Sequence, residues 1–408
     1  MRERWHYGWA VVAALSITET TSWGVLYYGF AVFLTPIEAS LGWSRVQMSG
    51  AFSLCLVVQG LAAMAVGRWL DGHSPRLLMT LGSVAATILT VLWSRVTSLS
   101  ALYVVWAAIG AVMATVLYEP AFIVVTKWFR ADRRAALTAI TLVAALASTI
   151  FLPLENKLIE AYGWRRALLV LALILGLVTI PLHGLVLRPA PALVDRKVSG
   201  PDQGVRGEDD IADHSTKEAL ASPTFWLLTA AYVLNAFVTS ALALHQVAYL
   251  IERGYGAAFA AGATGLLGAM QLPGRLLFAP LLRVLPRWVV TALVFGVVLA
   301  GLAVLAATDS TAMVWVFVVI YGIGRGMSTL LRATLVGELF GAANYGSISG
   351  ILTFFTTAAL AMGPLAAGLL YRGLGGYDDV LWLFVLVSAL ATVCAVLVER
   401  WPLPRRLA

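Results

Sequence analysis

Apolar residues run along this chain in long segments that short polar turns separate. A helix of about 20 apolar residues is long enough to cross the hydrocarbon core of a bilayer. The pattern therefore predicts an all-α membrane protein with twelve transmembrane helices. We expect them at 8–36, 46–70, 77–94, 99–127, 135–156, 166–187, 224–250, 257–281, 288–307, 311–336, 345–370 and 380–398.

One polar segment near the middle of the chain interrupts this pattern. It contains several proline and glycine residues and the acidic run Glu208-Asp209-Asp210, but few large apolar residues. Such a composition is typical of a linker rather than of a packed element. We therefore predict a six-helix bundle at 1–188, a cytoplasmic linker at 189–222 and a second six-helix bundle at 223–408.

A faint internal repeat relates the two predicted bundles. Gly42-Trp43 corresponds to Gly254-Tyr255, and at the same offset Gln59 corresponds to Gln271. Repeated six-helix units around a central binding site are a common plan for transporters. The repeat favours two pseudo-symmetric bundles.

Composition excludes a soluble protein. The chain is 60% hydrophobic and only 12% charged, whereas soluble domains are about 25% charged. Its net charge of +7 does not require a nucleic-acid partner, because the basic residues are unevenly placed along the spans. We assign to the cytoplasmic side Arg2, Arg4, Arg68, Arg76, Lys127, Arg130, Arg133, Arg134, Arg283, Arg287, Arg332, Arg400, Arg405 and Arg406.

The outer turns carry half as many basic residues, namely Arg45, Arg95, Lys157, Arg165, Arg166, Arg253 and Arg372. An excess of Lys and Arg marks the cytoplasmic side of a membrane protein. We therefore expect a multi-pass protein of a bacterial-type inner membrane, with both termini in the cytoplasm. We also expect it to act as a monomer.

The turn after the second predicted span carries a recognisable pattern. It reads Gly67-Arg68-Trp69-Leu70-Asp71-Gly72-His73-Ser74-Pro75-Arg76, which resembles the loop signature of the major facilitator superfamily. The resemblance implies that Gly67, Asp71 and Arg76 form a gating motif. Glycine permits close helix approach, and an aspartate can pair with partners in one state and release them in another. An ordinary polar turn with a capping aspartate is the alternative.

Two further segments resemble the monocarboxylate transporter and oxalate:formate antiporter branch of that superfamily. They are residues 23–34, Trp-Gly-Val-Leu-Tyr-Tyr-Gly-Phe-Ala-Val-Phe-Leu, and residues 271–276, Gln-Leu-Pro-Gly-Arg-Leu. The resemblance places Arg275 where such carriers hold a substrate carboxylate. Two residues depart from the branch: Tyr28 stands where animal carriers have a lysine, and Gln271 stands where they have an aspartate. These departures concern the coupling mechanism rather than the fold.

Two arginines fall within predicted spans, where a charge is costly and usually functional. Arg275 offers a planar fork that matches a carboxylate, and it stays protonated. Arg325 lies among three glycines, which leave room for a ligand or for a neighbouring helix. Both could bind substrate, and together they would suit a dicarboxylate. Each could instead be a structural partner of a buried glutamate.

Two glutamates also fall within spans. Glu19 lies halfway along the first span and Glu119 precedes Pro120 in the fourth. Burial favours the neutral form of a carboxyl and a neighbouring arginine favours the charged form. Either glutamate could therefore carry a proton together with an anion, or form a permanent strut with an arginine.

Neutral or titratable groups could add contacts to the substrate. These candidates are Tyr27, Tyr28, Asn235, His245 and Gln271. A histidine can titrate or donate a hydrogen bond, although aromatic and polar residues in helices are also common packing residues.

These features predict a secondary transporter of small mono- or dicarboxylates, driven by proton symport or anion exchange. The alternative is an exporter of lipophilic or cationic compounds, in which Glu19 and Glu119 would hold the cation. We expect no enzyme activity, cofactor or metal, because the sequence lacks a histidine-rich metal motif, a Gly-x-Ser-x-Gly elbow and a phosphate loop. The expected partners are a small carboxylate, protons or a counter-anion, and the lipid bilayer.

Overall fold

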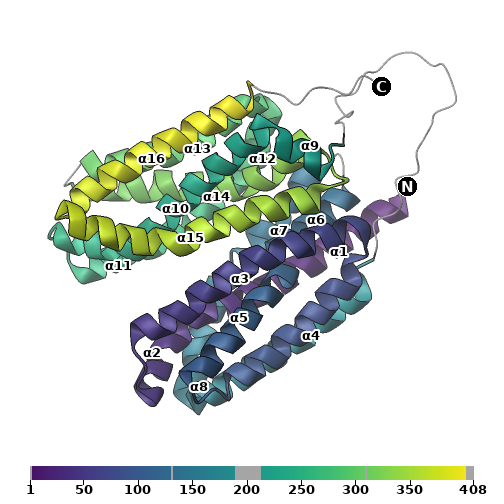
Figure 1. Cartoon of the computed structure of the whole chain (residues 1–408), viewed down its shortest axis with the longest axis horizontal. Helices are drawn as coiled ribbons and strands as arrows, with labels where there is room; N and C mark the ends of the chain where they lie inside the picture. The colour runs from purple at the N-terminus through teal and green to yellow at the C-terminus, as the bar shows by residue number, and fades with distance from the viewer. Residues whose placement is uncertain (1, 130–131, 189–212, 308–309, 401–408) are drawn as a thin grey trace.

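The computed structural model describes residues 2–129, 132–188, 213–307 and 310–400. Every regular element in these ranges is a helix (Figure 1). The first half contains α1 (Arg2–Ser22), the π-helix η1 (Trp23–Tyr28), α2 (Gly29–Leu41), α3 (Arg45–Gly72), α4 (Pro75–Trp93), α5 (Leu99–Val116), α6 (Tyr118–Trp128), α7 (Arg133–Ala144), α8 (Ala147–Pro181) and the π-helix η2 (Leu182–Val186). The second half contains α9 (Thr216–Ala221), α10 (Pro223–Glu252), α11 (Ala257–Ala269), α12 (Gln271–Val284), α13 (Arg287–Ala307), α14 (Thr311–Phe340), α15 (Tyr345–Leu374) and α16 (Tyr377–Val398).

Local sequence signals set many of the helix ends. Ser44 and Gln47 form a reciprocal capping box at the start of α3, which satisfies backbone N–H groups that have no partner within the helix. Ser74 caps α4 and Pro75 follows at its first position, where a missing N–H costs nothing. At the end of α2, Gly42 adopts a left-handed φ of 70°, a conformation that glycine reaches without strain.

The chain crosses the membrane twelve times, as the sequence predicts. Eleven helical stretches are long and apolar enough to span, and the longest, Arg133–Val186, crosses twice. It turns at Gly163, whose φ is 74°, and there Arg165 donates hydrogen bonds to the turn after α4. The stretch then returns to Val186, whose carbonyl accepts a hydrogen bond from Tyr7 near the start of α1.

Pseudo-symmetry relates the two bundles. Gly42 and Gly254 both have positive φ and are 212 residues apart, and Gly163 and Gly375 repeat this relation at the same spacing. The matching turns follow α2 and α10 in one pair and divide α8 and end α15 in the other. The repeat seen in the sequence therefore corresponds to equivalent turns in the two bundles.

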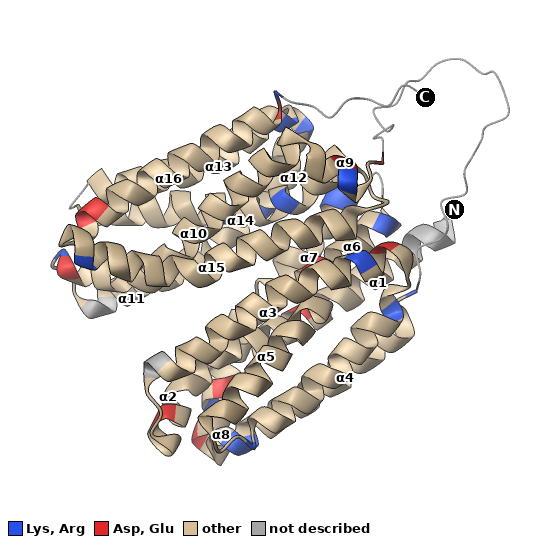
Figure 2. Cartoon of the chain, in the orientation of Figure 1, with Lys and Arg blue, Asp and Glu red and all other residues tan. Residues whose placement is uncertain are grey.

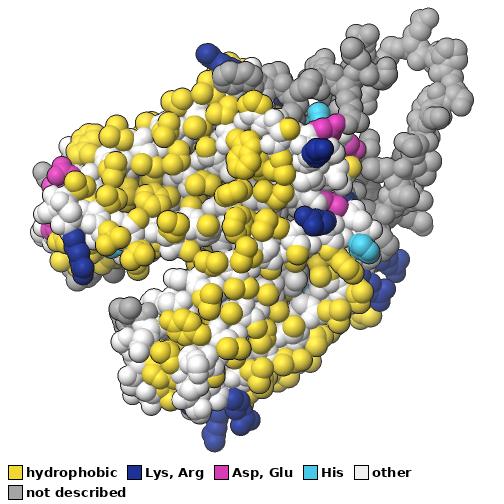
Figure 3. Space-filling model, viewed as in Figure 1, with side chains coloured by type: hydrophobic (Ala, Val, Ile, Leu, Met, Phe, Trp, Pro, Cys, Tyr) yellow, Lys and Arg dark blue, Asp and Glu magenta, His cyan; other side chains and the backbone are white. Residues whose placement is uncertain are grey.

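The bundles meet at one end and diverge at the other. We call the end where α1 begins and α16 ends the terminal end (Figure 1). One buried apolar cluster joins residues of both bundles, from Val11 to Val398. Two others stay within one bundle, at residues 25–175 and 238–384. Figure 3 shows the bundles separated at the opposite end, and Figure 2 shows charged residues gathered mainly at the two ends.

Part of the predicted linker can be described. Residues 189–212 lie outside the described residues, and Thr216–Ala221 forms the short helix α9. Just before it, Asp213 accepts hydrogen bonds from the backbone N–H groups of Ala342 and Ala343, in the turn between α14 and α15. The end of the linker is thus attached to the second bundle at the terminal end.

Candidate functional site

A cavity of about 550 Å³ lies between the two bundles. Most of the residues that the sequence singles out contribute to its lining, namely Tyr27, Tyr28, Glu119, Asn235, Gln271, Arg275 and Arg325. They come from η1, α6, α10, α12 and α14, which are far apart in the sequence. The fold therefore brings these candidates to a single place.

Helix interruptions surround this cavity. In four places the regular α-helix stops beside residues that line it: before Trp23, at Leu117, after Ala144 and before Gln271. Interrupted helices free backbone groups within the membrane, and this is tolerated where they border a cavity. Such breaks are typical of transporter binding sites.

The break before α12 positions Arg275. The chain leaves the α11 helix at Met270, where ψ is −9°, and α12 begins at Gln271. Pro273 therefore lies in the first turn of α12, where its missing N–H removes no hydrogen bond. A side chain on Gly274 would overlap the carbonyl of Ile323, so this glycine lets α12 pack directly on α14.

The glycines around Arg325 serve the same packing. A Cβ on Gly322 would meet Met270, and one on Gly326 would overlap the carbonyl of Gln271. Two of the three glycines therefore face the break between α11 and α12 rather than a ligand. The sequence left two explanations for these glycines, room for a ligand or room for a neighbouring helix. The structure favours close helix packing at these positions.

Arg332 is a cavity residue that the sequence analysis misplaced. We assigned it to a cytoplasmic segment, but it lies within α14 and lines the cavity, so that assignment is wrong. The signal was present, because the polar residues Arg325, Ser328, Thr329 and Arg332 follow helical spacing and all line the cavity. Residues three, four and seven apart share one face of a helix.

The three cavity arginines differ in their partners. Arg332 pairs with Glu119 across the two bundles, and it also donates to Thr353 at 3.2 Å. In contrast, no acidic residue in the described ranges pairs with Arg275 or Arg325. Arg275 is 7% exposed.

The Arg275 guanidinium retains donor capacity. It donates to the backbone carbonyl of Thr141 in α7, while its buried Nε has no hydrogen-bond partner. A buried guanidinium that lacks a counter-ion is costly. The site is therefore suited to receive an anion.

Aromatic rings form the facing wall on the first bundle. Trp23, Tyr27 and Tyr28 all line the cavity from η1, because the wider turn of a π-helix brings residues four and five apart to one side. Glu19 lies fully buried behind this wall, and one of its carboxylate oxygens accepts a 3.1 Å hydrogen bond from Trp23. Its other oxygen has no hydrogen-bond partner.

Glu119 connects the bundles at the cavity. Besides its ion pair with Arg332, it accepts a hydrogen bond of 2.7 Å from Ser349 in α15. Both partners belong to the second bundle. These two contacts therefore exist only while the bundles are close together beside the cavity. In this structure Glu119 is paired with an arginine, and its role in proton coupling stays a prediction.

His245 lies apart from the other candidates. Its ring hydrogen-bonds the Tyr377 hydroxyl at 2.9 Å and the Pro364 carbonyl at 3.0 Å. These contacts join α10 to α15 and α16 within one bundle, and His245 is not among the residues that line the cavity.

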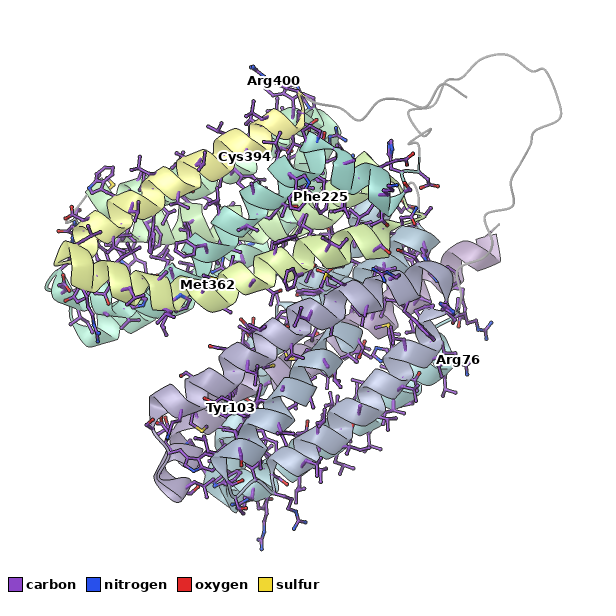
Figure 4. The ribbon with its side chains drawn as sticks, in the orientation of Figure 1. Arg76, Tyr103, Phe225, Met362, Cys394 and Arg400 are labelled. Carbon is purple, nitrogen blue, oxygen red and sulfur yellow. The ribbon has the colours of Figure 1, made fainter. Side chains whose placement is uncertain are left out.

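The predicted gating residues divide into two groups. Asp71 accepts hydrogen bonds of 2.8 and 2.7 Å from the backbone N–H groups of Gly346 and Ser347, at the N-terminus of α15. A Cβ on Gly67 would overlap the Gly346 carbonyl. Arg76, however, is exposed at the start of α4, on the outer side of the first bundle (Figure 4).

Two buried titratable groups escaped the sequence analysis. Glu155 in α8 is fully buried and neither carboxylate oxygen has a hydrogen-bond partner. His183 in η2 is also fully buried and hydrogen-bonds the hydroxyls of Ser83 and Thr18. Neither lines the cavity. The sequence offered one signal for both residues, because each lies inside a predicted span, near the end of that span.

Comparisons with known proteins agree with this architecture. The Major Facilitator Superfamily profile matches residues 12–360. Monocarboxylate transporter 12-B of Danio rerio is 24% identical over 97% of this chain and 88% of its own length. The oxalate:formate antiporter of Oxalobacter formigenes is 23% identical over 84% of this chain and 80% of its own length.

Solved structures share the fold at low sequence identity. The Escherichia coli fucose:proton symporter has a TM-score of 0.74 at 14% identity, covering 95% of this chain and 98% of that one. A bacterial homologue of the iron transporter ferroportin also has a TM-score of 0.74, at 16% identity, covering 96% of this chain and 99% of that one.

Proposed function

Because this chain belongs to the major facilitator superfamily, we propose that it carries small organic acid anions, mono- or dicarboxylates, across the membrane. It is a membrane transporter, and the substrate class is our inference. The observation that carries this inference is the pair of cavity arginines, Arg275 and Arg325, that have no acidic partner among the described residues. The names of the relatives, which refer to monocarboxylates and to oxalate and formate, support the same class.

Charge balance explains why this pair matters. Arg332 and Glu119 neutralise each other, so the cavity keeps the positive charge of Arg275 and Arg325. A desolvated guanidinium binds a carboxylate through two parallel hydrogen bonds. We propose that Arg275 holds the substrate carboxylate and that Arg325 assists, with neutral contacts from Tyr27, Tyr28, Asn235 and Gln271. His245, outside the cavity lining, would act through helix packing.

Alternating access supplies the transport cycle in this proposal. The units that rock are residues 1–188 and 223–408, joined by the linker at 189–222. With both termini in the cytoplasm of a bacterial-type cell, the diverging end faces outward and the cavity receives substrate from outside. One chain lines the whole cavity, so a monomer suffices.

The coupling ion is a separate part of the proposal. Protonation of Glu119 would remove its ion pair with Arg332 and let the bundles separate at the terminal end, which links a proton to transport. Glu19 is the second candidate proton carrier. Uptake into proteoliposomes distinguishes the mechanisms: a pH gradient drives symport, whereas anion exchange requires substrate inside the vesicles.

A thermal-shift screen of the purified protein tests the substrate class. A ligand that binds only the folded state raises its stability, so short carboxylates should stabilise the wild type and not Arg275→Ala. The matched control is Arg283→Ala, because Arg283 lies on the same helix but is exposed and does not line the cavity. Stabilisation by lipophilic cations instead of carboxylates would contradict the proposal and favour the exporter of cations.

A further inference from the structure

The two walls of the cavity differ in chemistry. The second bundle supplies all three arginines that line it, together with most of the lining hydroxyls. The first bundle supplies no Lys or Arg and four of the six lining aromatic rings, those of Trp23, Tyr27, Tyr28 and Tyr118; the second bundle supplies Tyr232 and Tyr321. A ligand that fills the space between the walls therefore meets all the lining arginines on one side and most of the lining aromatic rings on the other.

The rings form one cluster centred on Trp23. Its ring centroid lies 4.9 Å from that of Tyr27, 6.3 Å from that of Tyr28 and 4.9 Å from that of Tyr118. These separations match favourable aromatic contacts. The indole N–H is bound to Glu19 at 3.1 Å, which fixes the ring orientation.

The aromatic cluster lies close to the free arginines. Both arginines and all four rings line the same cavity. Neither arginine is stacked on a ring, since the three cation–π contacts among the described residues involve other arginines. The guanidinium groups and the ring cluster are therefore available to one ligand at the same time.

We propose that the preferred substrate is a carboxylate that carries an aromatic ring. Its carboxylate binds Arg275 and Arg325, and its ring packs on the Trp23–Tyr118 wall. This inference rests on the proposed function and narrows it. A formate- or acetate-sized acid would use the arginines and leave the rings without contact, and the cavity of about 550 Å³ has the size of sites that hold larger ligands.

A ligand series on the wild type tests this preference without any substitution. Binding of phenylacetate, cyclohexylacetate and acetate is measured by calorimetry on the detergent-purified protein. Phenyl and cyclohexyl bodies are similar in size, so their difference isolates the ring–ring contact. Aromatic pairs add stability beyond apolar burial, equivalent to roughly three- to tenfold in affinity. We expect phenylacetate to bind tighter than cyclohexylacetate by that factor, and acetate to bind most weakly.

Substitutions at Trp23 test whether the preference for an aromatic ring comes from the Trp23–Tyr118 wall. Trp23→Leu should reduce the phenyl-to-cyclohexyl ratio to about one, whereas Trp23→Phe should retain most of it although it loses the N–H bond to Glu19. Trp288→Leu is the control, because Trp288 is 57% exposed on the outer surface and away from the cavity. The control should keep the wild-type ratio.

The outcomes separate this inference from the proposed function. Equal affinity for phenylacetate and cyclohexylacetate, or tightest binding of acetate, overturns the aromatic preference and leaves carboxylate transport standing. A ratio that survives in Trp23→Leu overturns the assignment to this wall. No binding of any of the three acids contradicts the proposed function itself.

Discussion

At the terminal end, polar contacts between the two bundles accompany contacts within each bundle, whereas the polar contacts described at the opposite end stay within one bundle. At the terminal end Asp71 binds the start of α15, and Arg134 pairs with Glu338 at 2.5 Å. At the opposite end Arg165 binds the turn after α4 within the first bundle, and Arg253 pairs with Asp378 within the second.

This difference indicates which contacts change during transport. Contacts within a bundle can persist while the bundles rock, so the opposite end keeps each bundle rigid. Contacts between bundles must break and re-form. Each contact between the bundles therefore contributes to the stability of the state in which the terminal end is closed, and its removal should favour opening.

The largest effect is expected at the Glu119–Arg332 pair. Removing one member of a buried ion pair leaves the other charge without compensation, which costs about 3–5 kcal/mol. Glu119→Gln and Arg332→Met should each lower the thermal midpoint in detergent, and the double variant should recover most of the loss. Single variants that unfold at the wild-type temperature, or a double variant as unstable as the summed losses, would contradict the strut.

Gly67→Ala should shift the equilibrium between open and closed terminal ends. The added methyl would overlap the Gly346 backbone, and overpacking of this kind costs about 1–3 kcal/mol, so the ratio of closed to open molecules should fall by about fivefold or more. Spin labels at Arg76→Cys and Arg283→Cys, both exposed, report the distance between bundles in a background without Cys55 and Cys394.

The matched control for this prediction is Gly72→Ala in the same helix. A Cβ at Gly72 would have no atom within 4 Å, so its label distances should equal those of the parent. If Gly67→Ala gives the same distances as Gly72→Ala, close approach at Gly67 does not control closure.

The smallest effects come from single carboxylates, and here the two ends can be compared directly. Asp71→Asn loses charge-assisted hydrogen bonds to a helix N-terminus and should destabilise closure by about 1–2 kcal/mol. Asp378→Asn removes a carboxylate that is 67% exposed, and an exposed pair contributes less than about 1 kcal/mol. The same spin-label distances should therefore change in Asp71→Asn only, and equal changes would show that the ends do not differ.

The sequence alone determined the helices and their order. Long apolar runs, the capping serines and the turn glycines are local signals, and the structure confirms the twelve crossings that they predict. The close approach at Gly67 and the contact of Asp71 lie where the loop pattern placed a gate, because the pattern itself encodes a glycine and a carboxylate at a helix end. Arg76 does not share this contact with the second bundle.

Tertiary structure decided which face of each helix meets a neighbour, the cavity or lipid. In a membrane an apolar residue satisfies both a lipid-facing and a helix-facing position, so hydrophobicity does not distinguish them. For this reason the sequence did not single out the aromatic wall. The polarity of a side chain likewise does not show whether it faces the cavity, a neighbouring helix or the membrane surface, so the sequence assigned Arg332, near the end of the expected span 311–336, to the cytoplasmic side and left His245 with the cavity residues. Pairing across the bundles neutralises Arg332 and leaves Arg275 and Arg325 without acidic partners among the described residues. It depends on contacts between residues more than a hundred positions apart, and only the folded arrangement creates them.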